Sequence, residues 1–151
     1  MQQTDKYELL TWSDLDNIAS DIVSWVNSIN FIPDCIIAIA RGGTFLGTLI
    51  SYKLNKPIKY IGISSYTESN KQTNIEFTQY ADISNFSKIL VIDDIIDSGN
   101  TIKAFKDVIE LNNSNCIFKY ATIYTTENKK QIVDFYKKIK TYKWIKFPWE
   151  A

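Results

Sequence analysis

The segment 89–101 places tight limits on how this chain can fold. An apolar run typical of a buried strand leads into the adjacent acids Asp93 and Asp94, and a small polar loop with Asp97 and Gly99 follows. Apolar residues at helical spacing come next, so the loop is expected to begin a helix. Open parallel sheets bind ligands at the carboxyl ends of their strands, and N–H groups at a helix start favour phosphate. Carboxylates beside such a loop would repel a bare anion, so the segment indicates a phosphorylated sugar bound with Mg²⁺.

The remaining sequence alternates between strand-like and helix-like segments. Strands are predicted at Cys35–Ala40, 58–64, 88–93 and 117–124, and helices at about 15–29, Thr44–Leu54 and 101–111. A capping box formed by Ser13 and Asp16 is expected to begin the first helix. The polar stretch 67–78 is predicted to be a loop, with a short strand near 75–77. The alternation predicts an α/β fold with a doubly wound, mostly parallel sheet and right-handed crossovers.

Composition narrows the function classes. The 151 residues are enough for a single domain, 1–151, with a core at about 12–126 and an aromatic, irregular tail at about 127–151. The balance of 17 acidic and 17 basic residues disfavours a nucleic-acid or acidic-membrane partner. The chain has no histidine, which excludes Ser-His and Cys-His catalysis and most zinc sites. We expect a cytoplasmic protein without a membrane span, because no apolar stretch is long enough and the start does not resemble a signal peptide. Cys35 and Cys116 are interpreted as small core residues, each at the start of a buried strand.

The segment 89–101 resembles the phosphoribosyl-diphosphate (PRPP) signature of type I phosphoribosyltransferases. That signature is a hydrophobic strand, Asp-Asp, two hydrophobic residues, Asp, Ser or Thr, Gly, any residue and Thr, and every position matches. The resemblance implies that Asp93 and Asp94 approach the ribose hydroxyls and Mg²⁺. It further implies that Asp97 takes the proton of purine N7, and that the 5′-phosphate is held by Asp97, Ser98, Gly99, Asn100 and Thr101.

Two further segments resemble the same family. Residues 40–43 match its diphosphate loop, in which Arg41 supplies positive charge and Gly42 and Gly43 allow close approach of the backbone. By this resemblance the Ala40–Arg41 peptide is expected to be cis. Ser65 and Tyr66 resemble the head of a flexible catalytic loop that closes over the ribose. No role is assigned to Lys71, which follows them.

The C-terminal segment 143–150 resembles the hood of bacterial xanthine-guanine and hypoxanthine phosphoribosyltransferases. In that hood Trp144 would stack on the purine, and the backbone of Ile145 would bind its exocyclic groups. Those enzymes usually carry a lysine after the last core strand that donates to purine O6. Here that position falls on Thr125 or Thr126, with Lys129 and Lys130 further along, and we expect Thr126 in the base site. Either a neighbouring lysine substitutes for the usual one, or the affinity for 6-oxopurines is reduced or altered. The preferred purine therefore stays open.

The resemblance implies an Mg²⁺-dependent transferase of purine salvage, which would convert PRPP and a 6-oxopurine to a nucleoside 5′-monophosphate and diphosphate. Two alternatives remain at this point. One is a non-catalytic regulator that senses PRPP or a nucleotide, and the other is a phosphoribosyltransferase for a non-purine base. Relatives are usually dimers or tetramers, so a homo-oligomer is expected.

Overall fold

The main sheet has the mostly parallel arrangement expected for a doubly wound fold. The computed structural model describes residues 6–67 and 73–150. Its six-stranded sheet has the order β4-β3-β2-β5-β6-β7, and only the β3–β4 pair is antiparallel. The strands are β2 (Cys35–Ala40), β3 (Ile58–Thr67), β4 (Thr73–Gln79), β5 (Lys88–Ile96), β6 (Ile117–Thr125) and β7 (Phe135–Ile139).

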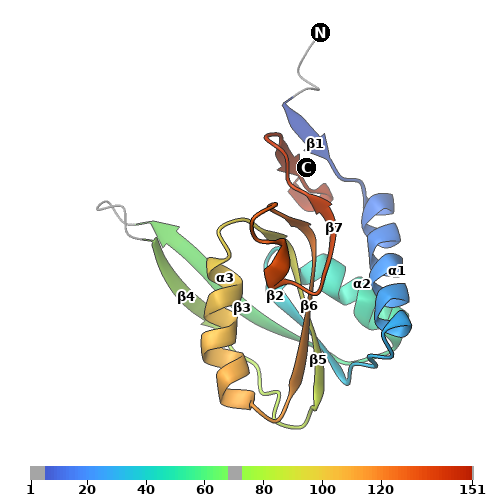
Figure 1. The fold of residues 1–151 in the computed structure, drawn as a ribbon, viewed down its shortest axis with the longest axis vertical. Helices are drawn as coiled ribbons and strands as arrows, with labels where there is room; N and C mark the ends of the chain where they lie inside the picture. The colour runs from blue at the N-terminus through green and yellow to red at the C-terminus, as the bar shows by residue number, and fades with distance from the viewer. Residues whose placement is uncertain (1–5, 68–72, 151) are drawn as a thin grey trace.

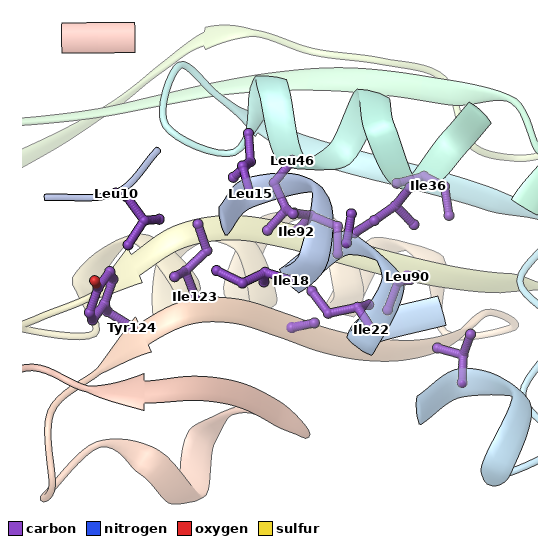
Figure 2. Packing of buried hydrophobic residues seen from close by; sticks show 14 of the residues in the cluster. Leu10, Leu15, Ile18, Ile22, Ile36, Leu46, Leu90, Ile92, Ile123 and Tyr124 are labelled. Atoms are coloured by element: carbon purple, nitrogen blue, oxygen red, sulfur yellow. The ribbon is translucent and has the colours of Figure 1, made fainter. Parts of the chain in front are cut away.

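Helices cover both faces of this sheet (Figure 1). Helices α1 (Trp12–Ser28) and α2 (Thr44–Leu54) pack on one face, and α3 (Asn100–Phe105), continued by a π-helical turn at Lys106–Glu110, packs on the other. Alternate residues of the central strands enter the two cores, as strand geometry requires. Leu90 and Ile92 of β5 lie with Ile18 of α1 in the first core (Figure 2), whereas Ile89 and Val91 belong to the second.

The two ends of the chain form a second, small sheet together. Strand β8 (Trp144–Lys146) pairs in parallel with β1 (Tyr7–Leu9), and Figure 1 shows this hood beside the upper end of β7. The prediction of an irregular tail was therefore wrong, because residues 127–151 contribute β7 to the main sheet and β8 to the hood. Packing against helix α1 stabilises β7, since the ring centroid of Phe135 lies 5.4 Å from that of Trp25 in α1.

Several predicted element boundaries differ from the structure. Thr11, and not Ser13, caps α1: Asp14 N–H donates to Thr11 Oγ1 at 3.0 Å, and Thr11 N–H donates to Asp14 Oδ2 at 2.8 Å. Strands β3 and β4 are longer than predicted and form a ribbon out of the predicted loop. The predicted helix 101–111 is divided into α3, the π-helical turn and a 3₁₀ turn at Leu111–Asn113. Tertiary pairing, which local sequence patterns do not contain, causes the strand extensions.

The cysteines follow the prediction only in part. Cys35 begins β2 and is fully buried, whereas Cys116 lies one residue before β6 and is partly exposed. Neither is in a disulfide. None of the helices in the described part of the chain combines the length and the apolar character needed to cross a bilayer.

Candidate active site

The predicted diphosphate loop lies directly against the PRPP motif. The loop connects β2 to α2, and its Ala40–Arg41 peptide is cis, as expected. Gly42 packs so closely on Asp94 of β5 that a Cβ at this position would collide with the Asp94 carboxyl group. Two motifs that are separated by some fifty residues in the sequence therefore meet in one site.

A cleft of about 810 Å³ opens beside this contact. Arg41, Gly42 and Asp94 line it from the sheet side, and Ser64 and Ser65 of β3 line it from a neighbouring strand. Trp149 and Glu150 contribute from the C-terminal end of the chain. The cleft thus offers a fixed positive charge, backbone and hydroxyl donors, and carboxylates, which is the chemistry needed for a diphosphate bound with a cation.

The turn after β5 has the conformation expected of a phosphate-binding loop. Gly99 has φ +84°, in the left-handed region, and it precedes α3. A pocket of about 140 Å³ at this turn is lined by Asp93, Asp97, Ser98, Gly99, Thr101 and Ser65, among others. Asn100 lies on the other side of the turn, where it lines a separate hollow, and its N–H donates to Ser98 Oγ at 3.2 Å. The structure therefore brings together the predicted phosphate ligands except the side chain of Asn100.

The Asp93 and Asp94 side chains line different cavities. Successive strand residues point to opposite faces, and accordingly Asp93 lines the small pocket while Asp94 lines the cleft. Burial raises the pKa of both carboxyl groups, and the neighbouring Asp94 carboxylate raises that of Asp93 further. The Glu150 carboxylate adds to the rise at Asp94. These buried acids therefore suit ligands that favour their charged form, namely a cation or hydroxyl donors.

The donor set fits Mg²⁺ held jointly with a substrate. Among residues 6–67 and 73–150, no cluster of acidic, cysteine or histidine side chains forms a complete metal cage. Magnesium usually takes only one or two protein carboxylates and completes its shell with water and phosphate oxygens. Asp94 can supply such a carboxylate, because it lines the cleft, and Ile95 N–H orients it by donating to Oδ1 at 2.7 Å.

Asp97, the predicted proton acceptor, has a partner that the sequence did not indicate. Lys140 Nζ lies 3.1 Å from Asp97 Oδ2. Lys140 follows the last residue of β7, and its backbone N–H donates to Thr125 O at 2.8 Å. Only the pairing of β7 with β6 brings it to Asp97, and β7 was not predicted. No local pattern would have revealed this contact.

In the hood, one predicted base-binding residue exposes its side chain and the other directs its backbone polar groups away from β1. The Trp144 side chain is 69% exposed, so its ring face is available. The Ile145 side chain is buried, but Trp144 N–H and Lys146 O bond to the β1 side, which directs the N–H and C=O of Ile145 away from β1. The Thr126 hydroxyl lies 2.8 Å from Asn128 Oδ1, to which it donates its proton.

The predicted catalytic-loop residues lie on a strand. Ser65 and Tyr66 belong to β3, and Ser65 borders both the cleft and the small pocket. Tyr66 is 47% exposed. Lys71 lies outside the described residues.

Comparisons with known proteins agree with this arrangement. A model of the phosphoribosyl transferase domain matches residues 8–151. The chain is 32% identical over 118 residues to a xanthine-guanine phosphoribosyltransferase of Desulfotalea psychrophila, covering 77% of this chain and 69% of that protein. A protein of the same name from Idiomarina loihiensis is 27% identical over 118 residues, covering 76% and 70%. The structure of Helicobacter pylori xanthine-guanine-hypoxanthine phosphoribosyltransferase superposes with a TM-score of 0.86 at 24% identity, covering 96% of this chain and 94% of that one. The chain belongs to the phosphoribosyl transferase family.

Proposed function

We propose that the protein is a purine phosphoribosyltransferase that transfers the 5-phosphoribosyl group of PRPP to a 6-oxopurine, namely hypoxanthine, guanine or xanthine. The observation that carries the proposal is the contact of Gly42 with Asp94, which joins a diphosphate site and a phosphate turn on one sheet edge. The names of the relatives and the exposed ring of Trp144 support a purine as the acceptor.

The site residues have different roles according to their position in the cleft or at the turn. The turn with Ser98, Gly99 and Thr101 binds the 5′-phosphate, and Arg41 with the backbone at Gly42 binds the diphosphate. Asp93 and Asp94 would hold the ribose hydroxyls and Mg²⁺, and the metal would neutralise charge on the departing diphosphate. Holding both ends of PRPP fixes ribose C1 for attack.

The transfer itself breaks the bond from ribose C1 to diphosphate oxygen and forms the bond from C1 to purine N9. A neutral base that carries its proton on N7 must lose this proton as N9 becomes bonded. Asp97 accepts it, so that nucleotide, diphosphate and a protonated carboxyl group result. Preorganised charge around the separating groups stabilises the transition state, and no covalent enzyme intermediate is required.

Purified protein with Mg²⁺, PRPP and a panel of bases tests the proposal through release of diphosphate and formation of nucleotide. The panel contains hypoxanthine, guanine, xanthine, adenine, orotate and nicotinate. We expect turnover with at least one 6-oxopurine. Saturable PRPP binding without turnover would favour the regulator, and turnover with orotate or nicotinate alone would favour the non-purine enzyme.

A cytoplasmic location and a homo-oligomeric state, dimer or tetramer, complete the proposal and rest on the resemblance to the family. Sedimentation velocity at several protein concentrations tests the oligomeric state.

A further inference from the structure

Lys140 reaches the candidate proton acceptor across the ends of neighbouring strands. It follows Ile139, which lies opposite Thr125 in the β6–β7 register, and Thr125 lies opposite Ile96 of β5. The Lys140 backbone is fixed to the end of β6 by its N–H bond to Thr125 O at 2.8 Å. From there the side chain extends over β6 to Asp97, where Nζ and Oδ2 are 3.1 Å apart.

Stability alone gives little reason for this ion pair. The Asp97 side chain is 65% exposed, and ion pairs with such exposed partners contribute little to folding. The Lys140 side chain is nevertheless only 26% exposed, compared with 42% for Lys137 and 46% for Lys138 in the preceding strand β7. An ammonium group is thus held at the carboxyl edge of the sheet, next to the acid that faces the substrate.

The adjacent charges match one edge of a 6-oxopurine. On that edge the 6-oxo group accepts hydrogen bonds, and in the reacting base N7 carries a proton to donate. A carboxylate and an ammonium group side by side offer the complementary acceptor and donor. The hydroxyl of Thr126, the residue after the intervening strand β6, already donates to Asn128.

We propose that Lys140 is the specificity-determining residue of the base site and donates to the 6-oxo group while Asp97 binds N7. This role rests on the proposed function, because it assumes a purine beside Asp97. The ammonium group is a donor without acceptor capacity, so it pairs with the oxygen of guanine or hypoxanthine and is mismatched with the amino group of adenine. A site that pairs with a polar group discriminates strongly against analogues that lack it.

Equilibrium binding of two nucleotides tests this role without turnover. Guanosine 5′-monophosphate carries the 6-oxo group, and the 5′-monophosphate of 2-aminopurine riboside lacks both this group and the proton on N1. The loss of the N1 proton is the same in every variant, so the comparison between variants reports the contact with the 6-oxo group. In Lys140→Met we expect affinity for guanosine monophosphate to fall about 10- to 100-fold, the value of a hydrogen bond to a charged group, with little change for the analogue. Lys140→Arg should retain part of the preference, because arginine keeps a charged donor.

Lys137→Met, in the strand β7 that precedes Lys140, is the matched control, since it also removes an ion-paired lysine, and it should change neither affinity. Equal losses for both nucleotides in Lys140→Met would overturn the proposed contact. If Lys140→Met does not fold, the wild-type protein alone tests the proposed contact. Equal affinity of the wild-type protein for the two nucleotides would also overturn that contact. Failure of the proposed function would appear separately, as an absence of base turnover in the wild-type protein.

Discussion

At the scale of single residues, the adjacent acids of the PRPP motif act on opposite sides of one strand. Asp93 lines the small pocket at the turn after β5 and Asp94 lines the cleft beside Gly42, so one β5 strand end borders both pockets. Ser65 of β3 borders both hollows too. A ribose that is bound between its two phosphoryl groups would then contact both acids.

Replacing Asp97 tests the assigned proton transfer. We expect Asp97→Asn to lower kcat by about 10²- to 10⁴-fold, the usual contribution of general acid–base catalysis, because the amide cannot accept the proton of N7. PRPP affinity should change little, since the backbone and hydroxyl groups of the turn remain. Steady-state kinetics and direct PRPP titration measure the two effects. Asp107→Asn, which removes an exposed acid paired with Lys103, is the control. Unchanged turnover in Asp97→Asn would remove the proton role.

The site residues divide into those that sequence can and cannot reveal. Contiguous motifs predicted Arg41, Asp94 and Gly99, because a turn that binds a phosphate needs its residues next to one another; the structure places Arg41 and Asp94 in one cleft and Gly99 at the turn after β5. Lys140 was missed, because its position depends on the register of an edge strand and not on its neighbours in sequence. Thr126 was expected on the base from alignment alone, and its hydroxyl bond to Asn128 could be seen only in three dimensions.

At the scale of elements, buried strands were predicted more accurately than edge strands. The structure confirms the predicted bounds of β2 and the approximate bounds of α2. Strand β2 is a continuous apolar run because helices cover both faces of the sheet. Strand β7 contains two consecutive lysines, and its pattern has no apolar run or clear alternation. Pairing with β6 and packing on α1 determine its structure, and neither can be predicted from a short stretch of neighbouring residues.

The N-terminal cap of α1 can be tested by comparing two substitutions in the same segment. Thr11→Ala should lower the free energy of unfolding by about 1 kcal/mol, because it leaves the N–H of Asp14 without its side-chain acceptor. Ser13→Ala, at the position the sequence pattern favoured, should have a much smaller effect. Urea unfolding followed by circular dichroism compares the two variants. A larger loss for Ser13→Ala would contradict the assigned cap.

Asp34 joins the starts of two neighbouring strands and predicts a pH dependence. Its Oδ2 accepts from the N–H groups of Ser87 and Lys88, each at 2.9 Å, and these bonds lower the pKa of the carboxyl group. A lowered native pKa stabilises the fold above the unfolded pKa of about 3.9, and this contribution is lost as the pH falls through the native value.

We therefore expect Asp34→Ala to be less stable than wild type by about 1 kcal/mol at pH 7, and the difference to shrink below about pH 4. Urea unfolding at a series of pH values measures it. Asp16→Ala, which removes an exposed acid paired with Lys53, should show no comparable dependence. A difference for Asp34→Ala that grew towards low pH would contradict this sign.

At the scale of the whole molecule, the proposed base site depends on both ends of the chain. Strand β8 carries Trp144 and Ile145, and it is held by β1 at the opposite terminus. The hood was predicted from the C-terminal resemblance, but its N-terminal strand was not, because only a few residues pair and they leave no strand pattern. The parallel core and the C-terminal hood could be predicted from sequence, whereas the pairing of β8 with β1 could not.

Glu8 of β1 links this hood to the main sheet. Its Oε1 accepts from the hydroxyl of Tyr124 in β6 at 2.8 Å and from Lys138 Nζ at 3.0 Å. Glu8 also lies opposite Ile145 in the β1–β8 ladder. Contacts from the main sheet therefore fix the strand beside the residue whose backbone is expected to bind the purine.

Tyr124→Phe should loosen the hood while leaving the PRPP site intact. The tyrosine ring is fully buried, so phenylalanine preserves the packing and removes only the hydroxyl bond to Glu8. We expect faster amide hydrogen exchange in β1 and β8 with unchanged protection in β2 and β5, and a higher KM for the base than for PRPP. Tyr120→Phe is the matched control on the same strand, because its hydroxyl donates to Glu110 on the opposite face of the sheet. If both variants changed exchange in the hood equally, or if Tyr124→Phe raised the KM for PRPP as much as that for the base, Glu8 would not be the link between sheet and hood.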